Sequence, residues 1–149
     1  MTADLMEQIR HYCAYQERCH SEVRKKLYEL SFSGGDLEEV IGTLIEEDFL
    51  NEERFARSYC RGKFGLKHWG KRKILNHLKQ KQVSEYCIRK GLEEIEEDKY
   101  EHVFLELFQK KWDSLSGEKN HWIKKKKTRD YLLAKGFESE LIYEQFKKC

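Results

Sequence analysis

The chain has 149 residues, enough for one ordinary globular domain or for several small helical units that share a core. Proline is absent, 38% of the residues are charged and 13% are aromatic, a composition that favours helices and excludes a mainly disordered chain. The net charge of +2 conceals an alternation of −6 over residues 1–50, +9 over 51–90, −6 over 91–118 and +5 over 119–149, so we expect any phosphate-binding surface to be local.

Helix-start signals recur along the chain and predict nine helices. Asp36 stands three residues before Glu39, as in a capping box. The other predicted N-caps are Ser21, Asn51, Ser84 and Ser139. The predicted helices cover residues 4–17, 21–31, 36–48, 52–66, 70–81, 84–97, 99–115, 119–135 and 139–148. Apolar residues recur in them every three or four positions, so each helix is amphipathic and too short to be stable alone.

The apolar spacing shows which face of each helix should be buried. The third helix has Leu37, Val40, Ile41, Leu44 and Ile45 on one stripe. The fifth helix has Ile74, Leu75 and Leu78, and the sixth has Ile88, Leu92 and Ile95. These stripes predict a helical core and no sheet.

A comparison of the chain with itself groups the nine helices in threes. A leucine stands five residues before an apolar residue in Leu27–Phe32, Leu78–Val83 and Leu132–Phe137, with offsets of 51 and 54 residues between the copies. Units of this kind stack, because one unit cannot bury its apolar stripe alone. The predicted fold is therefore all-α, an elongated and curved tandem array of three helix-turn-helix-like repeats over residues 1–50, 51–98 and 99–149.

Three segments carry the motifs of a known family. They are CHSEVRKKLYEL (Cys19–Leu30), FLNEERFARSYCR (Phe49–Arg61) and WGKRKILNHLKQKQVS (Trp69–Ser84). Their order and spacing resemble the RecX family over residues 19–95. The chain departs from the family pattern at Lys71, where proline is usual, and the third repeat is recognisable mainly through KGFESELI (Lys135–Ile142). The resemblance implies a protein that lies along the RecA–DNA filament and restrains its strand-exchange and coprotease activities, in DNA repair and the SOS response.

The second repeat concentrates the basic residues that we predict to contact RecA or DNA. They are Arg54, Arg57, Arg61, Lys63, Lys67, Lys71, Arg72 and Lys73. The three arginines are spaced i, i+3 and i+7 and share one helix face, which can bind phosphates or an acidic protein surface. The alternative is a solvated surface held by pairs such as Glu53 with Arg57. Lys71–Lys73 at a helix start oppose the helix dipole, which favours an anionic partner.

A second basic run in the third repeat belongs to the same prediction. It comprises Lys124, Lys125, Lys126, Lys127 and Arg129. Cations in five of six positions cover all helix faces, so part of the run must face water and either follows a nucleic-acid backbone or keeps the unit soluble. Trp69 and Trp122 occupy comparable positions between helices, and packing of the turn is favoured over base stacking for both.

No catalytic, metal or cofactor site is predicted, and we do not expect an enzyme. The acidic strips Glu46–Asp48 and Glu93–Asp98 lack a nearby nucleophile or phosphate loop, so they are interpreted as solvated faces or as surfaces that repel DNA. The six histidines are scattered, and Cys19 with His20 supplies only two metal ligands. The five cysteines lack a Cys-x-x-Cys pair, so we expect reduced thiols.

The partners and location follow from these points. No apolar run reaches the roughly 20 residues that span a bilayer, and the N-terminus lacks signal-peptide features, so we expect a cytoplasmic protein without membrane contact. The expected partner is the RecA filament, with single- or double-stranded DNA contacted directly or through RecA, by a monomer. One alternative is a helix-turn-helix-like protein that binds duplex DNA directly, and another is a structural repeat scaffold.

Overall fold

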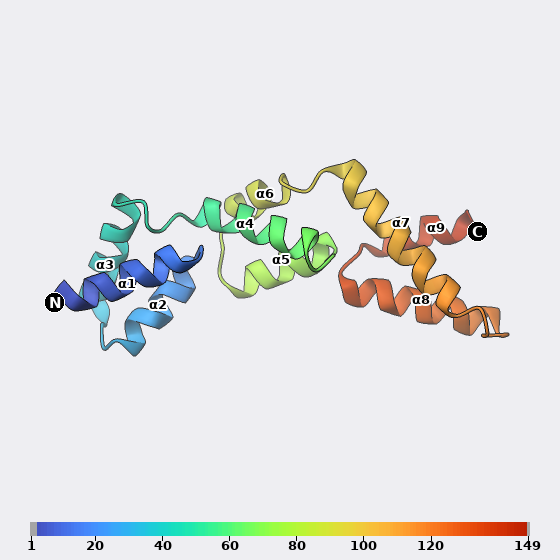
Figure 1. Cartoon of the computed structure of the whole chain (residues 1–149), viewed down its shortest axis with the longest axis horizontal. Helices are drawn as coiled ribbons and strands as arrows, with labels where there is room; N and C mark the ends of the chain where they lie inside the picture. The colour runs from blue at the N-terminus through green and yellow to red at the C-terminus, as the bar shows by residue number, and fades with distance from the viewer. Residues whose placement is uncertain (1–2, 149) are drawn as a thin grey trace. The chain divides into compact units, whose positions relative to one another are not determined.

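A computed structural model describes residues 3–148, and within this range every regular element is a helix (Figure 1). The helices are α1 (Ala3–Tyr15), α2 (His20–Glu29), α3 (Gly34–Glu46), α4 (Glu52–Gly65), α5 (Lys71–Gln80), α6 (Glu85–Leu92), α7 (Glu97–Ser114), α8 (His121–Lys135) and α9 (Ser139–Lys147). The all-α prediction and the nine predicted helices are confirmed for the described residues. The helix ends differ from the predicted ones by up to five residues.

Two of the predicted N-caps are confirmed. Asn51 Oδ1 accepts a hydrogen bond from the Arg54 N–H at 2.9 Å, and Ser84 Oγ accepts one from the Cys87 N–H at 3.2 Å. These bonds satisfy backbone donors that have no partner inside the helix. The two caps fix where α4 and α6 begin.

The other three predicted N-caps are wrong, because each helix begins one to three residues earlier. The N-cap of α2 is Cys19, where the Glu22 carboxylate accepts the Cys19 N–H at 3.0 Å and so completes a capping box. The N-caps of α3 and α9 are Ser33 and Glu138, which place the predicted caps Asp36 and Ser139 inside the helices. Neither Ser33 nor Glu138 makes a side-chain cap bond. Serine is a favoured N-cap residue type and glutamate is not, so residue type could have indicated Ser33 but not Glu138.

The sixth helix is shorter than predicted. It ends at Leu92, and Glu93–Glu96 form a connecting segment before α7. Ile95, predicted on the helix face, is buried from this segment, with 4% of its surface exposed. Local propensity favours a longer helix, but the segment gains the burial of Ile95 and ion pairs with α4, so tertiary contacts override propensity.

The repeated leucine motif is a helix C-cap. Phe32, Val83 and Phe137 each donate their N–H to the carbonyl of the leucine five residues earlier, at 3.0, 3.1 and 3.1 Å. The residue before each donor has a left-handed backbone, with φ of 73° at Ser31, 63° at Gln82 and 100° at Gly136. This is the Schellman pattern, in which the bonded pair also makes an apolar contact. All six apolar residues are buried, so the three sequence copies are the same structural device.

The chain forms two compact units. The N-terminal unit contains the residues up to Tyr59 and Leu78–Glu93. In it α2 packs against α1 and α3 (Figure 1). Its core consists of Ile9, Cys13, Val23, Leu27, Phe32, Val40, Ile41, Leu44 and Leu50. The division into repeats at residues 50/51 and 98/99 is a different partition and stays a prediction.

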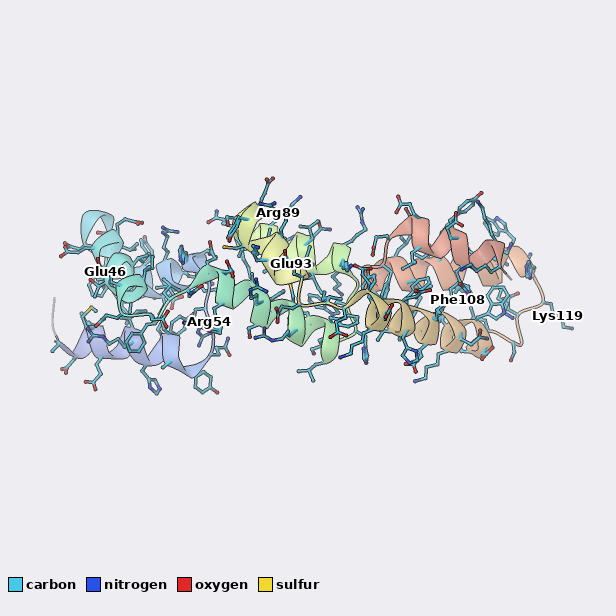
Figure 2. All side chains as sticks on the ribbon, turned by 90° about the horizontal axis from the view of Figure 1, so that it is seen from above. Glu46, Arg54, Arg89, Glu93, Phe108 and Lys119 are labelled. Carbon is cyan, nitrogen blue, oxygen red and sulfur yellow. The ribbon has the colours of Figure 1, made fainter. Side chains whose placement is uncertain are left out.

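The C-terminal unit contains Cys60–His77 and the chain from Glu94 onward. Its core is aromatic: Phe137 lies 5.4 Å from Phe104 and 5.3 Å from Tyr100 between ring centroids. Phe108 meets Phe146 edge-on at 5.2 Å, and Figure 2 labels Phe108 on α7. Edge-on and tilted ring pairs of this kind add to the stabilisation that apolar burial provides.

A close backbone contact joins the start of α5 to the end of α8 within the C-terminal unit. The Gly70 N–H donates to the Lys135 carbonyl at 2.7 Å, and the Arg72 N–H donates to the Gly136 carbonyl at 3.0 Å. A β-carbon on Gly70 would lie 2.2 Å from the Gly136 carbonyl carbon, and one on Gly136 would lie 2.3 Å from Lys73 Cβ. Only glycine permits this approach, which places the basic start of α5 on α8.

Candidate functional site

The first set of predicted contact residues lies on α4, on α5 and in the turn between them, and is called the α4–α5 basic group. It comprises Arg54, Arg57, Arg61, Lys63, Lys67, Lys71, Arg72 and Lys73. Arg54, labelled in Figure 2 on the first turn of α4, donates from Nε to Glu17 Oε1 at 2.8 Å and from Nη1 to Asp48 Oδ1 at 3.1 Å. The bond to Glu17 raises the pKa of Arg54. The side chain of Arg54 is therefore engaged by Glu17 and Asp48, two residues that precede α4.

The next two arginines are also paired with carboxylates. Arg57 Nε lies 3.1 Å from Glu53, which confirms the predicted i, i+4 pair, and its Nη2 lies 3.8 Å from Glu93. Arg61 Nη1 lies 2.6 Å from Glu94. All these groups keep part of their surface in water, so each pair contributes no more than about 1 kcal/mol to stability.

Lysines at the start of α5 follow the same pattern. Lys71 Nζ lies 2.7 Å from Glu97 and 4.6 Å from the centroid of the Tyr100 ring. The buried Tyr100 hydroxyl accepts the Lys71 N–H at 2.9 Å and donates to Glu138, and its pKa is raised by burial and by the bond with Glu138. The start of α5 is thus fixed by both its backbone and its side chains.

Trp69 lies between two lysines of the α4–α5 basic group. Lys63 Nζ is 4.9 Å and Lys73 Nζ 4.4 Å from the ring, and His77 packs against it at 4.6 Å. Trp69 is half-buried, so the prediction that it packs the turn is confirmed. Lys67 and Arg72 are exposed beside it. Arg61 is exposed as well, but it is paired with Glu94, whereas within residues 3–148 neither Lys67 nor Arg72 forms an ion pair.

The acidic segment 93–98 supplies three of the paired carboxylates. Glu93, Glu94 and Glu97 meet cations of α4 and α5, and Figure 2 labels Glu93 at the end of α6. Glu97 and Glu93 keep 83% and 59% of their side-chain surface exposed, as expected of a solvated face, whereas Glu94, at 26%, is partly buried. Sequence spacing gave no signal for the pairs, because the partners are 26 to 36 positions apart.

The second set of predicted residues, called the α8 basic group, comprises Lys124, Lys125, Lys126, Lys127 and Arg129. Lys124 Nζ lies 4.1 Å from the Trp112 ring and Lys125 Nζ 5.8 Å from the Phe146 ring. Lys126 and Arg129 lie 3.1 and 3.6 Å from Asp130, and Lys127 lies 3.8 Å from Glu118. Lys126, Lys127 and Arg129 are exposed, as expected from a run that covers every helix face.

Trp122 does not pack the turn. It is the second residue of α8, and 69% of its surface is exposed. The prediction of a packing role is therefore wrong for Trp122. The tryptophan that packs this end of the unit is Trp112, which stacks on Phe108 at 6.3 Å and meets His121 edge-on at 5.5 Å. The shared position of Trp69 and Trp122 between helices did not reveal this difference.

The cysteines of residues 3–148 are buried or half-buried. Cys13, Cys19, Cys60 and Cys87 are free thiols, and Cys149 lies outside the described residues. Burial raises the pKa of Cys60 to about 12 and that of Cys13 to about 11, which keeps both thiols protonated and unreactive. Within residues 3–148, histidine, cysteine and acidic side chains form no cluster of three that could hold a metal ion. None of the described helices is long and apolar enough to cross a membrane.

Comparison with known proteins identifies the family. A family model described as RecX, second three-helix domain, matches residues 51–92, and one described as RecX, third three-helix domain, matches residues 98–145. The chain belongs to the RecX family. The α4–α5 basic group lies within the first matched RecX segment, and the α8 basic group lies within the second.

Relatives and solved structures agree with this assignment. The chain is 31% identical to Regulatory protein RecX of Halalkalibacterium halodurans over 91% of its length, and 29% identical to Regulatory protein RecX of Bacillus cytotoxicus over 88%. It spans about half the length of each, 51% and 48%. A crystal structure of RecX from Lactobacillus salivarius superposes with a TM-score of 0.83 at 24% identity, over 99% of this chain and 97% of that one. This likeness shows the fold.

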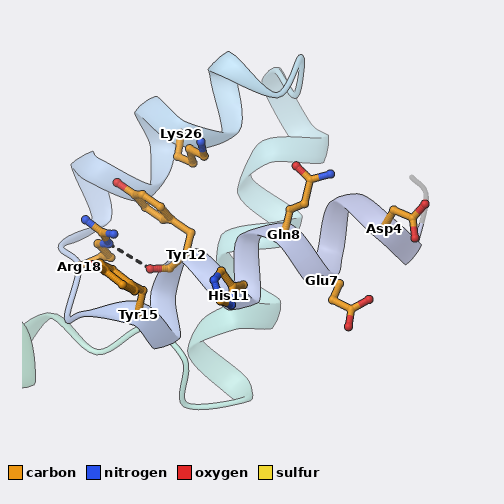
Figure 3. Close-up of a pocket in the computed structure, with 8 residues that line it drawn as sticks. All are labelled: Asp4, Glu7, Gln8, His11, Tyr12, Tyr15, Arg18 and Lys26. Carbon is orange, nitrogen blue, oxygen red and sulfur yellow. Dashed lines mark hydrogen bonds between the residues drawn. The ribbon is translucent and has the colours of Figure 1, made fainter.

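A surface hollow on α1 and α2 lies outside both matched RecX segments (Figure 3). Its volume is about 680 Å³, and it is lined by Asp4, Glu7, Gln8, His11, Tyr12, Tyr15, Arg18 and Lys26. Arg18 stacks over the Tyr12 ring at 3.8 Å and donates from Nε to the Tyr12 carbonyl at 3.1 Å. Its lining contains two acidic and two basic side chains, so it has no preference for an anion.

Proposed function

We propose that this RecX-family chain is a regulatory protein without catalytic activity that binds the RecA recombinase filament and restrains its recombinase and coprotease activities. In this proposal the α4–α5 basic group and the α8 basic group contact RecA or the DNA that it carries, and the chain acts as a monomer. Regulation then results from occupancy of the filament, with no chemical step on either partner.

The observation that carries the proposal is the match of two RecX three-helix domains to the segments that hold both basic groups. Relatives with the name Regulatory protein RecX support a regulatory role. A local positive surface also fits a DNA-containing filament, because cations speed association with phosphates and with acidic protein faces.

The test is binding to RecA-coated single-stranded DNA, compared with bare single-stranded and duplex DNA at two salt concentrations. The informative variant is Lys67→Glu with Arg72→Glu, because both side chains are exposed. Reversing Arg57, Arg61 or Lys71 would instead break ion pairs within the fold. A matched control is Lys25→Glu with Lys110→Glu, two exposed lysines outside both groups that give the same change in net charge.

We expect wild type to prefer the coated filament, and the Lys67/Arg72 variant to lose about tenfold in affinity, since two rim charges each contribute on the order of 0.5–1 kcal/mol. The control variant should change the affinity less than about threefold by the same reasoning. Equal binding to bare duplex DNA, without any effect of RecA, would contradict the proposal.

A second candidate function is direct binding to duplex DNA. Arg72, Asn76 and Lys79 are exposed on α5 at i, i+4 and i+7, so they share one helix face. Arginine and asparagine are the side chains that read guanine and adenine edges in a major groove. Duplex binding that depends on Asn76 and on sequence, but not on RecA, would favour this function over the first.

A further inference from the structure

Trp122 is exposed at the head of the most basic stretch of the chain. Residues 119–129 contain six cations and no acidic residue. The first turn of α8 likewise holds no acid, although the helix dipole favours one there. A single exposed apolar residue needs no explanation, but an indole ring beside a concentration of cations is the combination that binds nucleic acid.

The geometry of α8 places cations beside the indole. Lys125 and Lys126 follow Trp122 by three and four positions, so they lie one turn further along the same side of the helix. Arg129 follows at i+7 on that side. Lys119 precedes α8 on the loop from α7, and Figure 2 shows it projecting outward from the end of the unit. Asp130, which pairs with Lys126 and Arg129, is exposed and offsets only part of this charge.

We propose that Trp122 and the cations beside it form a binding site for single-stranded DNA. One unpaired base stacks on the exposed face of the indole, and Lys119, Lys125 and Lys126 bind the phosphates on either side of that base. The choice of single-stranded DNA as the ligand rests on the proposed function, because a RecA filament contains single-stranded DNA. The site itself binds DNA without RecA.

The structure favours a single strand over the other anionic surfaces. A duplex keeps its bases stacked on one another, so it could use the lysines but not the indole face. A membrane surface requires a continuous apolar helix face. The large apolar residues exposed on α8 are Trp122 and, 11 positions later, Leu133, and Lys126 and Arg129 lie between them.

Trp122→Ala tests the site, measured by anisotropy of a labelled 20-mer of thymidine without RecA, with the matching duplex and with vesicles of anionic lipid as comparisons. Base–aromatic stacking contributes about 1–3 kcal/mol per base, so we expect a loss of roughly 5- to 150-fold for the single strand. Duplex affinity should change less than about twofold, because phosphate contacts are kept. Trp122→Phe, which keeps an aromatic face, should retain most of the affinity.

Two controls separate this site from general effects. Tyr28→Ala removes another exposed aromatic, with 74% of its surface exposed, from α2 and should leave single-strand affinity unchanged. Quenching of tryptophan emission by the 20-mer should disappear in Trp122→Phe, because Trp69 and Trp112 are half-buried. Unchanged single-strand affinity in Trp122→Ala overturns the proposal, as does an equal loss for duplex, or a loss for vesicles alone. Failure to bind the RecA filament would overturn the proposed function but leave this result standing.

Discussion

The two basic groups of this chain have similar charge but different partners. Arg57, Arg61 and Lys71 of the α4–α5 basic group meet carboxylates that lie 26 to 36 positions later in the sequence. In the α8 basic group, Lys126, Lys127 and Arg129 pair with Asp130 or Glu118, within nine positions, and Lys124 lies over an aromatic ring. Folding therefore engages the first group through the tertiary structure and the second mainly through its own surroundings.

This difference decides how accessible each group is to a partner. A ligand at Arg61 or Lys71 must displace Glu94 or Glu97. A ligand at α8 competes with Asp130 or Glu118, but it also meets an exposed indole and two lysines that lie over aromatic rings. Cation–π contacts leave the full charge on the lysine, so they do not reduce the attraction for a phosphate as a carboxylate does. Equal numbers of basic residues in a sequence thus do not mean equal affinity for anions.

The largest expected effect comes from breaking the backbone contact that holds the α4–α5 basic group in place. Gly136→Ala puts a β-carbon 2.3 Å from Lys73 Cβ and strains a residue with φ of 100°. We expect a loss of about 2–4 kcal/mol in the free energy of unfolding, measured by urea denaturation. Gly62→Ala is the control: its β-carbon meets nothing within 4 Å, and alanine in α4 should stabilise by up to about 1 kcal/mol. If Gly136→Ala left the free energy of unfolding unchanged, the backbone around Gly136 would have moved to make room for the added β-carbon.

Tyr100→Phe removes the buried hydroxyl that fixes the start of α5. The Lys71 N–H and the Glu138 carboxylate would each lose a partner. We expect a destabilisation of about 1–3 kcal/mol, because unsatisfied part-buried polar groups keep their desolvation cost. The measurement is thermal unfolding. The affinity for single-stranded DNA, which we propose for α8, should stay unchanged and serves as the control. An unchanged melting temperature would mean that water replaces the hydroxyl.

Removing the carboxylates that pair with the α4–α5 basic group should make this group as accessible to an anion as the α8 basic group. Glu94→Gln with Glu97→Gln releases Arg61 and Lys71, and we expect an approximately two- to fivefold gain in affinity for the RecA filament, from two exposed pairs of up to about 0.5 kcal/mol each.

The matched control for this gain is Glu96→Gln with Asp98→Asn. It changes the net charge equally within the same acidic strip, and Glu96 pairs with Lys99 instead of with the α4–α5 basic group. An equal gain in both variants would show that only total charge matters and would remove the distinction between the two groups.

The smallest expected effect is in the second group. Asp130→Asn removes the carboxylate shared by Lys126 and Arg129, about half of whose side-chain surfaces are exposed. We expect the free energy of unfolding to change by less than about 0.5 kcal/mol, and the affinity for single-stranded DNA to rise less than twofold. Exposed ion pairs between neighbouring residues contribute little. A gain larger than that of the Glu94/Glu97 variant would reverse the comparison.

Much of the fold was predictable because it depends on local chemistry. Helical spacing of apolar residues predicted all nine helices, and the caps Asn51 and Ser84 were identified from residue type. The repeated leucine motif marked the three Schellman turns, since the same bond closes each turn. The RecX motifs were recognised from Cys19–Leu30, Phe49–Arg61 and Trp69–Ser84.

The tertiary structure decided what happens at a distance along the chain. It ended α6 at Leu92, brought Glu93, Glu94 and Glu97 to the basic residues of α4 and α5, and placed Gly70 against Gly136. It also exposed Trp122 while burying Trp69 in part. Helix periodicity tells which side of a helix is apolar, but the partner of a charge and the exposure of an indole depend on which other segments pack beside it. That information lies in the packing of the whole chain and not in any single segment.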